Sequence, residues 1–438
     1  MTTAAENELL TRVGPGTPMG EFMRQFWMPA AMSTEVKADG EPMRLKLLCE
    51  QLICFRDSNG RVGIMDHRCP HRCASLFFGR NEEGGIRCVY HGWKFDTEGN
   101  CLDMANVPPH QDFKHKVHAK AYKTVERNGL IWVYMGDQSK VPALPDLEAN
   151  LCPADQMDIN FQFRECNWLQ AVEGDIDTSH LGFLHYGAVP DKLTTRDINT
   201  YSVKNRTPEY MAQETDYGLM YGAYRPGRTA DELYWRVAHF MFPCWTMPPL
   251  DTLQANVSTR GYIPLDDENT MIVILFKSDI RSEEVAKERE ERAGGPDFQY
   301  LPNTTDWLGR WRLKQNKSND YMIERDLQRD FNFTGIRGII LQDQAMVESM
   351  DPIVDRTLEH LAPSDMAVTR NRRVLVRAVQ EHQKSGALPK LASEPKLARG
   401  VRGGAFFAPK ATDWLDAYKG ELDQAPLEDR IAHPLAAE

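Results

Sequence analysis

Two short segments combine cysteine and histidine at spacings suited to binding metal. Cys69-Pro70-His71 is followed, after sixteen intervening residues, by Cys88-Val89-Tyr90-His91. Two thiolates and two neutral imidazoles can bind zinc, but in zinc fingers the two cysteines share one segment and the two histidines share the other. Here each segment supplies one of each, so two sulfurs can hold one iron of a cluster while two imidazoles hold the other. Zinc remains the alternative on the residue types alone.

A further histidine pair, His180 and His185, lies in a segment that also carries Glu173 and Asp177. Residues five apart are rotated by about 140° on an ideal helix, so the two histidines share a face only if the helix ends or bulges between them. Gly182 lies between them and could permit such a break. Without other support, a histidine pair of this kind is more often structural than metal-binding.

Together the two regions resemble the Rieske ring-hydroxylating oxygenases. The cluster segments of that family read C-x-H and C-x-x-H, and its iron segment reads E-x3-D-x2-H-x4-H. The beginning of the chain, with Glu6 to Leu10 and Arg24-Gln25-Phe26-Trp27, resembles the phthalate dioxygenase group. The resemblance implies a [2Fe-2S] cluster and one Fe(II) per chain, with O2 as co-substrate. The implied cluster ligands are Cys69, His71, Cys88 and His91.

The resemblance also implies that His180, His185 and a later aspartate bind the mononuclear iron, with other positions open for O2. Asp343, in the segment from Gly338 to Glu348, best matches the family's third ligand. It lies 158 residues after His185. Three other carboxylates are close in sequence and compete for this role, namely Asp330, Asp351 and Asp355.

Asp177 has a different expected role. It precedes His180 by three residues, which on one helix would place its carboxylate beside the imidazole, where it can accept the ring N–H that iron leaves free. In the family this aspartate also links to a cluster histidine of the neighbouring subunit, here His91. The resemblance therefore implies a homo-oligomer, a trimer or two stacked trimers. Glu173 is expected to support the iron ligands without touching the iron.

The elements that must position these residues divide the chain into four parts. Residues 1–42 are expected to form a lead-in of short helical pieces and loops. Short apolar runs separated by turn residues, including Asn59-Gly60 and Asn128-Gly129, predict an antiparallel β domain at 43–137. A proline-rich linker at 138–157 leads to a catalytic domain at 158–438 that mixes strands and helices. The fold class is α+β, and the resemblance implies a helix-grip, START-like second domain.

Composition restricts the partners. A net charge of −11 and a pI near 5.6 argue against nucleic acid, and no stretch approaches the eighteen apolar residues of a membrane span. The nine cysteines are scattered, which favours a reducing, cytoplasmic location over a disulfide framework. Cys73 is expected to be a free, packed thiol. No glycine-rich dinucleotide motif opens a helix, so NAD(P)H is expected to bind a separate flavin and iron-sulfur reductase.

The expected activity is therefore O2-dependent hydroxylation or dihydroxylation of a small aromatic acid of the phthalate or benzoate type. Oxidative O-demethylation of a methoxylated aromatic acid is the alternative within enzymes. A non-catalytic Rieske electron-transfer protein is the alternative of another class. Because arginine offers a two-pronged donor to a carboxylate, three arginines are candidates for binding the substrate: Arg225, Arg228 and Arg236.

Overall fold

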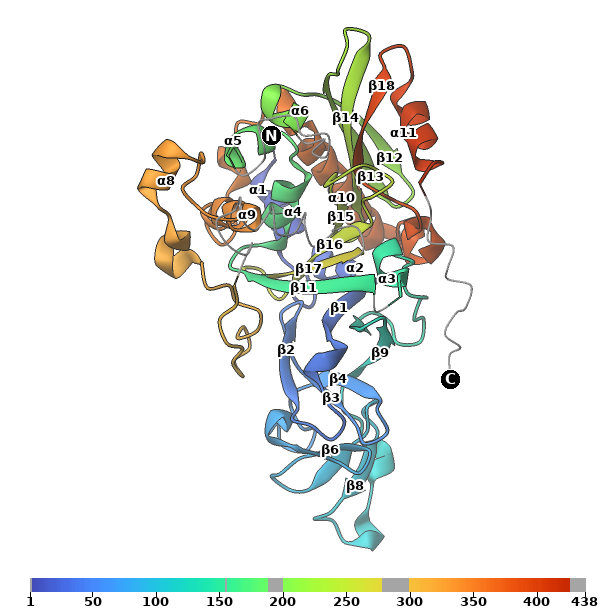
Figure 1. Cartoon of the computed structure of the whole chain (residues 1–438). Coiled ribbons are helices and arrows are strands. Elements are labelled where there is room, and N and C mark those ends of the chain that lie inside the picture. The colour runs from blue at the N-terminus through green and yellow to red at the C-terminus, as the bar shows by residue number, and fades with distance from the viewer. Residues whose placement is uncertain (1, 154–155, 188–199, 278–298, 426–438) are drawn as a thin grey trace.

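The computed structural model describes residues 2–153, 156–187, 200–277 and 299–425. Figure 1 shows an elongated molecule in which the early part of the chain forms a narrow β-rich end and the later part forms a broader sheet-and-helix end. Within the described residues, no helix combines the length and the apolar character needed to cross a bilayer.

The narrow end contains two antiparallel sheets. The larger has the strand order β1-β10-β9-β4-β3-β2. The Asn128-Gly129 turn joins β9 to β10 with positive φ at both residues (47° and 79°), as a two-residue hairpin with matching twist requires. The smaller sheet has the order β5-β6-β7-β8. The strands are β1 (Trp27–Met32), β2 (Met43–Leu47), β3 (Glu50–Arg56), β4 (Val62–Asp66), β5 (Arg80–Glu82), β6 (Gly85–Arg87), β7 (Trp93–Phe95), β8 (Cys101–Met104), β9 (Ala121–Arg127) and β10 (Leu130–Tyr134).

The broader end is built on one antiparallel sheet of eight strands, in the order β11-β17-β16-β15-β14-β13-β12, with β18 paired to β14. The longest strands are buried along most of their length, which indicates that helices or other elements cover them. The strands are β11 (Met157–Arg164), β12 (Glu209–Thr215), β13 (Gly218–Pro226), β14 (Glu232–Met241), β15 (Trp245–Met247), β16 (Ser258–Pro264), β17 (Thr270–Lys277) and β18 (Gly404–Pro409).

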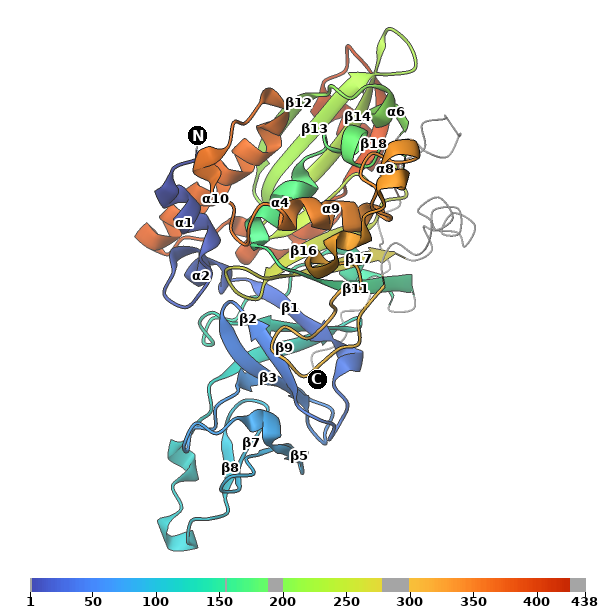
Figure 2. The same ribbon diagram turned by 90° about the vertical axis from the view of Figure 1, so that its left-hand side faces the viewer.

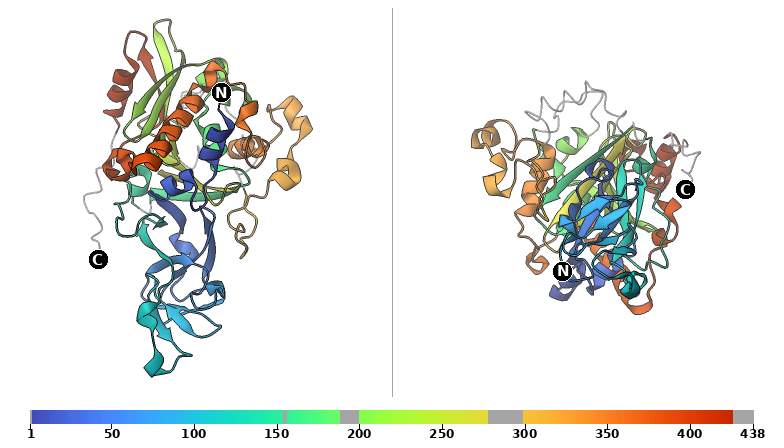
Figure 3. Two further views of the ribbon diagram at one scale, coloured as in Figure 1. Left: turned by 180° about the vertical axis from the view of Figure 1, so that it is seen from behind. Right: turned by 90° about the horizontal axis from the view of Figure 1, so that it is seen from below.

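Helices α4 and α9 lie side by side over this sheet, with α4 packed on β14, β15 and β16 (Figure 2). From behind, the long helix α10 lies beside the N-terminal helices, which it contacts (Figure 3). The fold class is thus the expected α+β arrangement. The helices are α1 (Ala4–Thr11), α2 (Pro18–Met23), α3 (Glu148–Leu151), α4 (Trp168–Ile176), α5 (Leu181–Leu184), α6 (Thr200–Lys204), α8 (Arg325–Asp330), α9 (Ile339–Glu348), α10 (Met366–Ser385) and α11 (Trp414–Leu422).

The first forty residues differ from the expected lead-in of helical pieces and loops. Trp27–Met32 forms strand β1 at the edge of the six-stranded sheet, where Pro29 is tolerated because an edge strand needs fewer backbone donors. The N-terminal helices are anchored to the broader end, since Trp168 Nε1 donates to the Leu10 carbonyl at 3.1 Å and Asn167 Nδ2 donates to the Thr11 carbonyl at 2.9 Å. This segment therefore connects the two ends of the molecule.

Candidate metal centres

The two cysteine-histidine segments form loops of the same shape. In each, the cysteine carbonyl accepts a hydrogen bond from the backbone N–H four residues later, at 2.9 Å. That later residue, Cys73 in one loop and Gly92 in the other, has positive φ (59° and 78°). One loop follows β4 and the other joins β6 to β7, and a buried apolar cluster that includes Cys69 and Cys88 packs the two loops together. The outcome is a matched pair of turns, each of which carries one cysteine and one histidine.

The four side chains converge between these loops. Cys69 and Cys88 are buried, with 1% and 3% of their surface exposed. The rings of His71 and His91 lie 4.4 Å apart between centroids, and His71 stacks on Trp93 at 4.3 Å. The buried Nδ1 of His91 has no hydrogen-bond partner. Two thiols, two imidazoles and an unpartnered ring nitrogen fit a [2Fe-2S] cluster held by one cysteine and one histidine from each loop.

The surroundings of Cys69 favour its protonated thiol. Burial raises the pKa of the Cys69 thiol to about 12 in the metal-free protein, and the nearby Cys88 adds to the shift. A coordinating metal reverses this, because a thiol bound to iron is deprotonated. Among the described residues no cysteine forms a disulfide, and Cys73 is exposed, which corrects the expectation that it is packed.

The second site lies under the helices of the broader end. His180 Nε2 and His185 Nε2 are 3.2 Å apart, and Asp343 Oδ1 lies 3.6 Å from the first and 3.1 Å from the second. Among the described residues, these three are the group of histidine, cysteine and carboxylate side chains whose ligand atoms all lie within 4.8 Å of one another, close enough to share one metal ion. Asp330, Asp351 and Asp355 are not part of it. A 2-His-1-carboxylate set of this kind suits a non-haem Fe(II) with open positions.

The two histidines meet because the helix is interrupted. Helix α4 ends before Asp177, and the single turn α5 begins after His180 and ends before His185. The rings are therefore nearly perpendicular, at 84°, with their Nε2 atoms facing each other. Asp177 and His180 do not share one helix, which differs from the expectation. Asp177 Oδ2 still lies 3.6 Å from His180 Nδ1, because the Ser179 N–H donates to Asp177 Oδ1 at 2.7 Å and folds the connection back.

His185 is held by a residue that the sequence did not single out. Gln342 Nε2 donates to the Ile336 carbonyl at 2.8 Å, so its Oε1 faces the ring and accepts from His185 Nδ1 at 2.8 Å. The proton is thus kept on Nδ1, and the lone pair of Nε2 points toward Asp343. The only signal in the sequence is that Gln342 directly precedes the predicted aspartate.

We expect Gln342→Leu to weaken binding of the mononuclear iron about tenfold to a hundredfold, because the imidazole loses the acceptor that sets its tautomer and orientation. Titration of the metal-depleted protein with Fe(II), followed by the iron retained after gel filtration, measures this. The cluster absorption should be unchanged and serves as the internal control. Wild-type retention in the variant would show that Gln342 does not position His185.

The carboxylates around this site favour a positive charge between them and the histidines. Burial alone would raise the pKa of Asp343, but His185 and His180 outweigh it and the pKa is lowered well below its usual range. Burial would lower the pKa of His180, but Asp177 and Asp343 outweigh it and raise the pKa. A divalent cation would replace the proton that these groups otherwise share, since metal ligands bind in their deprotonated forms.

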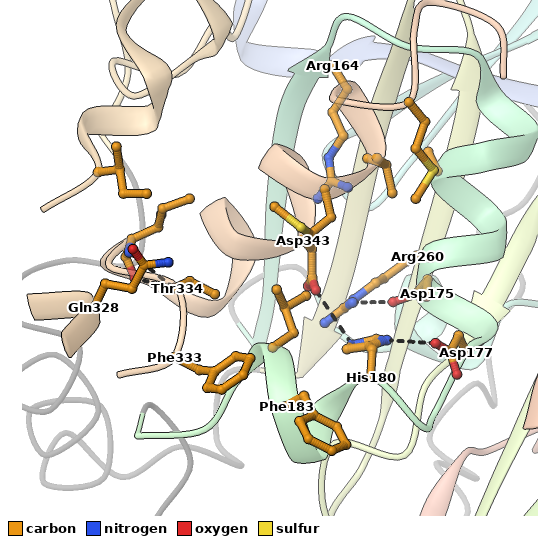
Figure 4. Close-up of a pocket in the computed structure, with 18 of the residues that line it drawn as sticks. Arg164, Asp175, Asp177, His180, Phe183, Arg260, Gln328, Phe333, Thr334 and Asp343 are labelled. Atoms are coloured by element: carbon orange, nitrogen blue, oxygen red, sulfur yellow. Dashed lines mark hydrogen bonds and ion pairs between the residues drawn. The ribbon is translucent and has the colours of Figure 1, made fainter. Parts of the chain in front are cut away.

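A cavity of about 590 Å³ opens beside the two accessible ligands, His180 and Asp343. Figure 4 shows both ligands in its middle, with Arg164 on one side and Phe183 and Phe333 on the other. The wall is mostly apolar, and three arginines also contribute to it: Arg164, Arg260 and Arg325.

The arginines proposed from the sequence do not line this cavity. Arg225 is buried and its Nε donates to the Asn205 carbonyl at 2.7 Å. Arg228 is exposed and forms an ion pair with Glu232. Arg236 is buried, and its Nε donates to Thr178 Oγ1 at 3.3 Å, in the connection between α4 and α5. Among the contacts between described residues, Arg236 is the one of the three arginines whose side chain reaches the connection between α4 and α5.

Glu173 takes part in a buried ion-pair network away from the histidines. Its carboxylate accepts hydrogen bonds from Arg356 at 2.8 Å and from Arg372 at 2.6 Å. Burial would raise its pKa, but the two guanidinium groups outweigh it, so the pKa is lowered. No contact between Glu173 and the three iron-site residues is found in the part of the chain that the structure describes. The network ties α4 to α10, and thereby supports the helix that leads to Asp177.

Comparison with known proteins agrees with these two sites. Residues 26–123 match the Rieske [2Fe-2S] domain, and residues 133–431 match a LigXa C-terminal domain like family. The 3-chlorobenzoate-3,4-dioxygenase oxygenase subunit of Comamonas testosteroni is 43% identical over 97% of this chain and 99% of its own length. The phthalate 4,5-dioxygenase oxygenase subunit of Pseudomonas putida is 34% identical over 99% of each chain.

A more partial match is the 5,5'-dehydrodivanillate O-demethylase oxygenase subunit of a Sphingobium species, 36% identical over 63% of each chain. The crystal structure of dicamba monooxygenase bound to dicamba has the same fold, with a TM-score of 0.57, 18% identity, and coverage of 83% of this chain and 99% of that chain. The chain therefore belongs to the Rieske non-haem iron oxygenases, in the phthalate dioxygenase-like group. It is an oxygenase subunit whose cofactors are a [2Fe-2S] cluster and a mononuclear iron.

Proposed function

We propose that this protein is the terminal oxygenase of a multicomponent system that oxidises an aromatic carboxylate of the benzoate or phthalate type with O2. The observation that carries the proposal is the presence, in one chain, of a cluster-binding loop pair and a separate His-His-Asp group beside a cavity with apolar and cationic walls. The two relatives matched over nearly their full length act, by name, on 3-chlorobenzoate and phthalate. A separate NAD(P)H-dependent reductase would supply the electrons.

The residue roles follow from the geometry. We assign the cluster to Cys69, His71, Cys88 and His91. We assign the iron to His180, His185 and Asp343. The cluster supplies single electrons and the mononuclear iron supplies O2 activation when bound. The chain itself orients the histidines through Gln342 and Asp177, keeps His185 almost out of water at 3% exposure, and surrounds the reacting space with apolar side chains.

The strands that flank the cluster loops lie in the narrow end of the molecule and α4 and α9 lie in the broader end (Figures 1 and 2), so we infer that the iron receives its electron from another copy. The exposure of residues at both sites supports this transfer between copies. At the tip of the second cluster loop, Val89 and Tyr90 are 58% and 55% exposed, and the Asp177 side chain is 24% exposed beside His180. We infer that His91 of one subunit contacts Asp177 of the next in a trimer or a pair of stacked trimers. The free cysteines support a reducing, cytoplasmic location.

An O2-uptake assay with a generic ferredoxin reductase tests the proposal. Protein containing about three iron atoms per chain should consume O2 and oxidise at least one acid among benzoates, chlorobenzoates and phthalates. No O2 consumption with any acid would remove the oxygenase function for this class of substrate. About two iron atoms per chain and no O2 consumption would instead indicate an electron-transfer protein.

Oxidative O-demethylation is a second candidate, favoured by the partial match to an O-demethylase subunit. The products separate the two reactions. Methoxybenzoates would release formaldehyde if a methyl C–H is oxidised, whereas ring dihydroxylation leaves the methoxy group in place and gives a diol.

A further inference from the structure

The three arginines of the iron-site cavity differ in how their charges are balanced. Arg260 forms an ion pair with Asp175. Arg325 is exposed at the start of α8, where its Nη1 donates to Gln328 Oε1 at 2.7 Å. Arg164, at the end of β11, is only 6% exposed. Within the described ranges its side chain has no ion pair, and its buried Nε has no hydrogen-bond partner.

The acidic groups near Arg164 are already engaged. Both oxygens of Glu348 accept hydrogen bonds from other groups, which include Gln344 at 2.8 Å and the Tyr321 hydroxyl. Asp343 faces His185 and His180, and bound metal would balance its charge. A guanidinium cannot lose its proton at neutral pH, and a buried cation without a partner is unfavourable. The guanidinium of Arg164 therefore lacks an anionic partner among the described residues of this cavity.

The opposite wall suits an aromatic ring. Phe183 and Phe333 lie 6.0 Å apart between ring centroids in an edge-to-face arrangement, and Leu184, Ile323 and Ile336 extend the apolar surface. In Figure 4, His180 and Asp343 lie between these phenylalanines and Arg164. A ring whose carboxylate is held at Arg164 would thus extend past the iron ligands toward the apolar wall.

We propose that Arg164 binds the substrate carboxylate and that the cavity accepts only one, so that the substrates are monocarboxylic aromatic acids with apolar substituents. This rests on the proposed oxygenase function and narrows its substrate class. The planar guanidinium can donate two parallel hydrogen bonds to one carboxylate. A second carboxylate would have to compete with Asp175 for Arg260 or lie at the exposed Arg325, where water screens the attraction, so phthalates are poorer ligands than benzoates.

Equilibrium binding to the holoenzyme under anaerobic conditions, measured by calorimetry, tests this with three probes: 3-chlorobenzoate, its neutral analogue 3-chlorobenzamide, and phthalate. The wild-type protein should bind 3-chlorobenzoate about tenfold or more tighter than either of the others. Arg164→Gln should weaken 3-chlorobenzoate about tenfold to a hundredfold and change 3-chlorobenzamide little. The matched control Arg329→Gln, an exposed arginine of α8 outside the cavity, should bind all three probes like the wild type.

Iron content and cluster absorption show whether each variant is folded and loaded. Unchanged 3-chlorobenzoate affinity in loaded Arg164→Gln overturns the assignment, and loss of that affinity in Arg236→Gln alone moves the carboxylate to the connection between α4 and α5. Tighter binding of phthalate than of 3-chlorobenzoate overturns the one-carboxylate limit. In each of these cases O2-dependent oxidation of an aromatic acid by the wild type would leave the proposed function standing. If Arg164→Gln loses its iron, the binding of the three probes is measured with Arg164→Lys instead, because lysine keeps the positive charge.

Discussion

Replacing Asp343 with alanine is expected to remove the mononuclear iron and abolish O2-dependent oxidation, while the cluster remains. Asp343 is the one anionic member of the His-His-Asp group, and its Oδ1 lies within 3.6 Å of both histidine Nε2 atoms. Two neutral imidazoles alone bind Fe(II) weakly, since carboxylate charge supplies much of the attraction for a divalent cation. Iron analysis should fall from about three to about two atoms per chain, with the visible spectrum of the cluster unchanged.

Asp330→Ala is the matched control. Asp330 is an exposed carboxylate of α8 that pairs with Arg329, and it competed with Asp343 on sequence alone. It should keep all its iron and its activity. If Asp343→Ala retains a full complement of iron and turns over, the third ligand lies elsewhere. If Asp330→Ala loses iron instead, the assignment from the geometry is wrong.

Replacing Asp177 with asparagine is expected to keep both metals and to slow turnover by about a hundredfold. The side chain keeps its size but loses the negative charge beside His180 Nδ1 and the ability to accept two strong hydrogen bonds. Burial would raise the pKa of Asp177, but His180 and the Ser179 N–H outweigh it, so the native residue is ionised at neutral pH. Asparagine therefore removes a charge that the native site always carries.

Single-turnover kinetics distinguish a role in electron transfer from a role in holding the fold. When the reduced variant is mixed with O2 and substrate, its cluster should stay reduced far longer than in the wild type, although iron content and oligomeric state are the same. Reoxidation of the cluster at the wild-type rate would refute the bridge between subunits. Loss of the oligomer in Asp177→Asn would assign the residue to assembly instead.

The two variants separate two functions at the same iron site. Asp343 is expected to bind metal, and Asp177 to connect one site to another. Exposure does not distinguish the two residues, since both side chains are about a quarter exposed, at 22% and 24%. The difference lies in their partners, because Asp343 faces two Nε2 atoms and Asp177 faces the Nδ1 side of one ring.

Much of the site could be predicted because its chemistry depends on local spacing. The cluster ligands lie within two short loops, and the turn that presents each cysteine involves only the next few residues. The iron histidines are likewise five residues apart, and the need for a helix break between them followed from the 100° rotation per residue. Such features can be predicted from the sequence because no contact with a distant part of the chain is needed to define them.

The conformation around those motifs was less predictable. Asp177 was expected on the same helix as His180, but α4 ends before Asp177, whose side chain then caps the following turn. Strand β1 was missed because Pro29 interrupts an apolar run that pairs only with the distant strand β10. In both cases the local sequence allows two conformations: a helix or a cap at Asp177, and a strand or a loop at β1. Packing against the rest of the chain decides which of the two forms.

By itself the sequence predicted the family, the two kinds of metal centre and all seven proposed ligands; six of these depend on residue type and short spacing, whereas Asp343 was chosen from several carboxylates close in sequence. Only the tertiary structure decided that Asp343 and no neighbouring carboxylate meets the histidines, that Gln342 orients His185, and that Arg164 is the buried cation of the cavity. These residues come from separate elements. Helix α9, which carries Asp343 and Gln342, begins more than 150 positions after the two histidines. Which side chains face one another across a sheet and a helix depends on packing, and packing is a property of the whole chain.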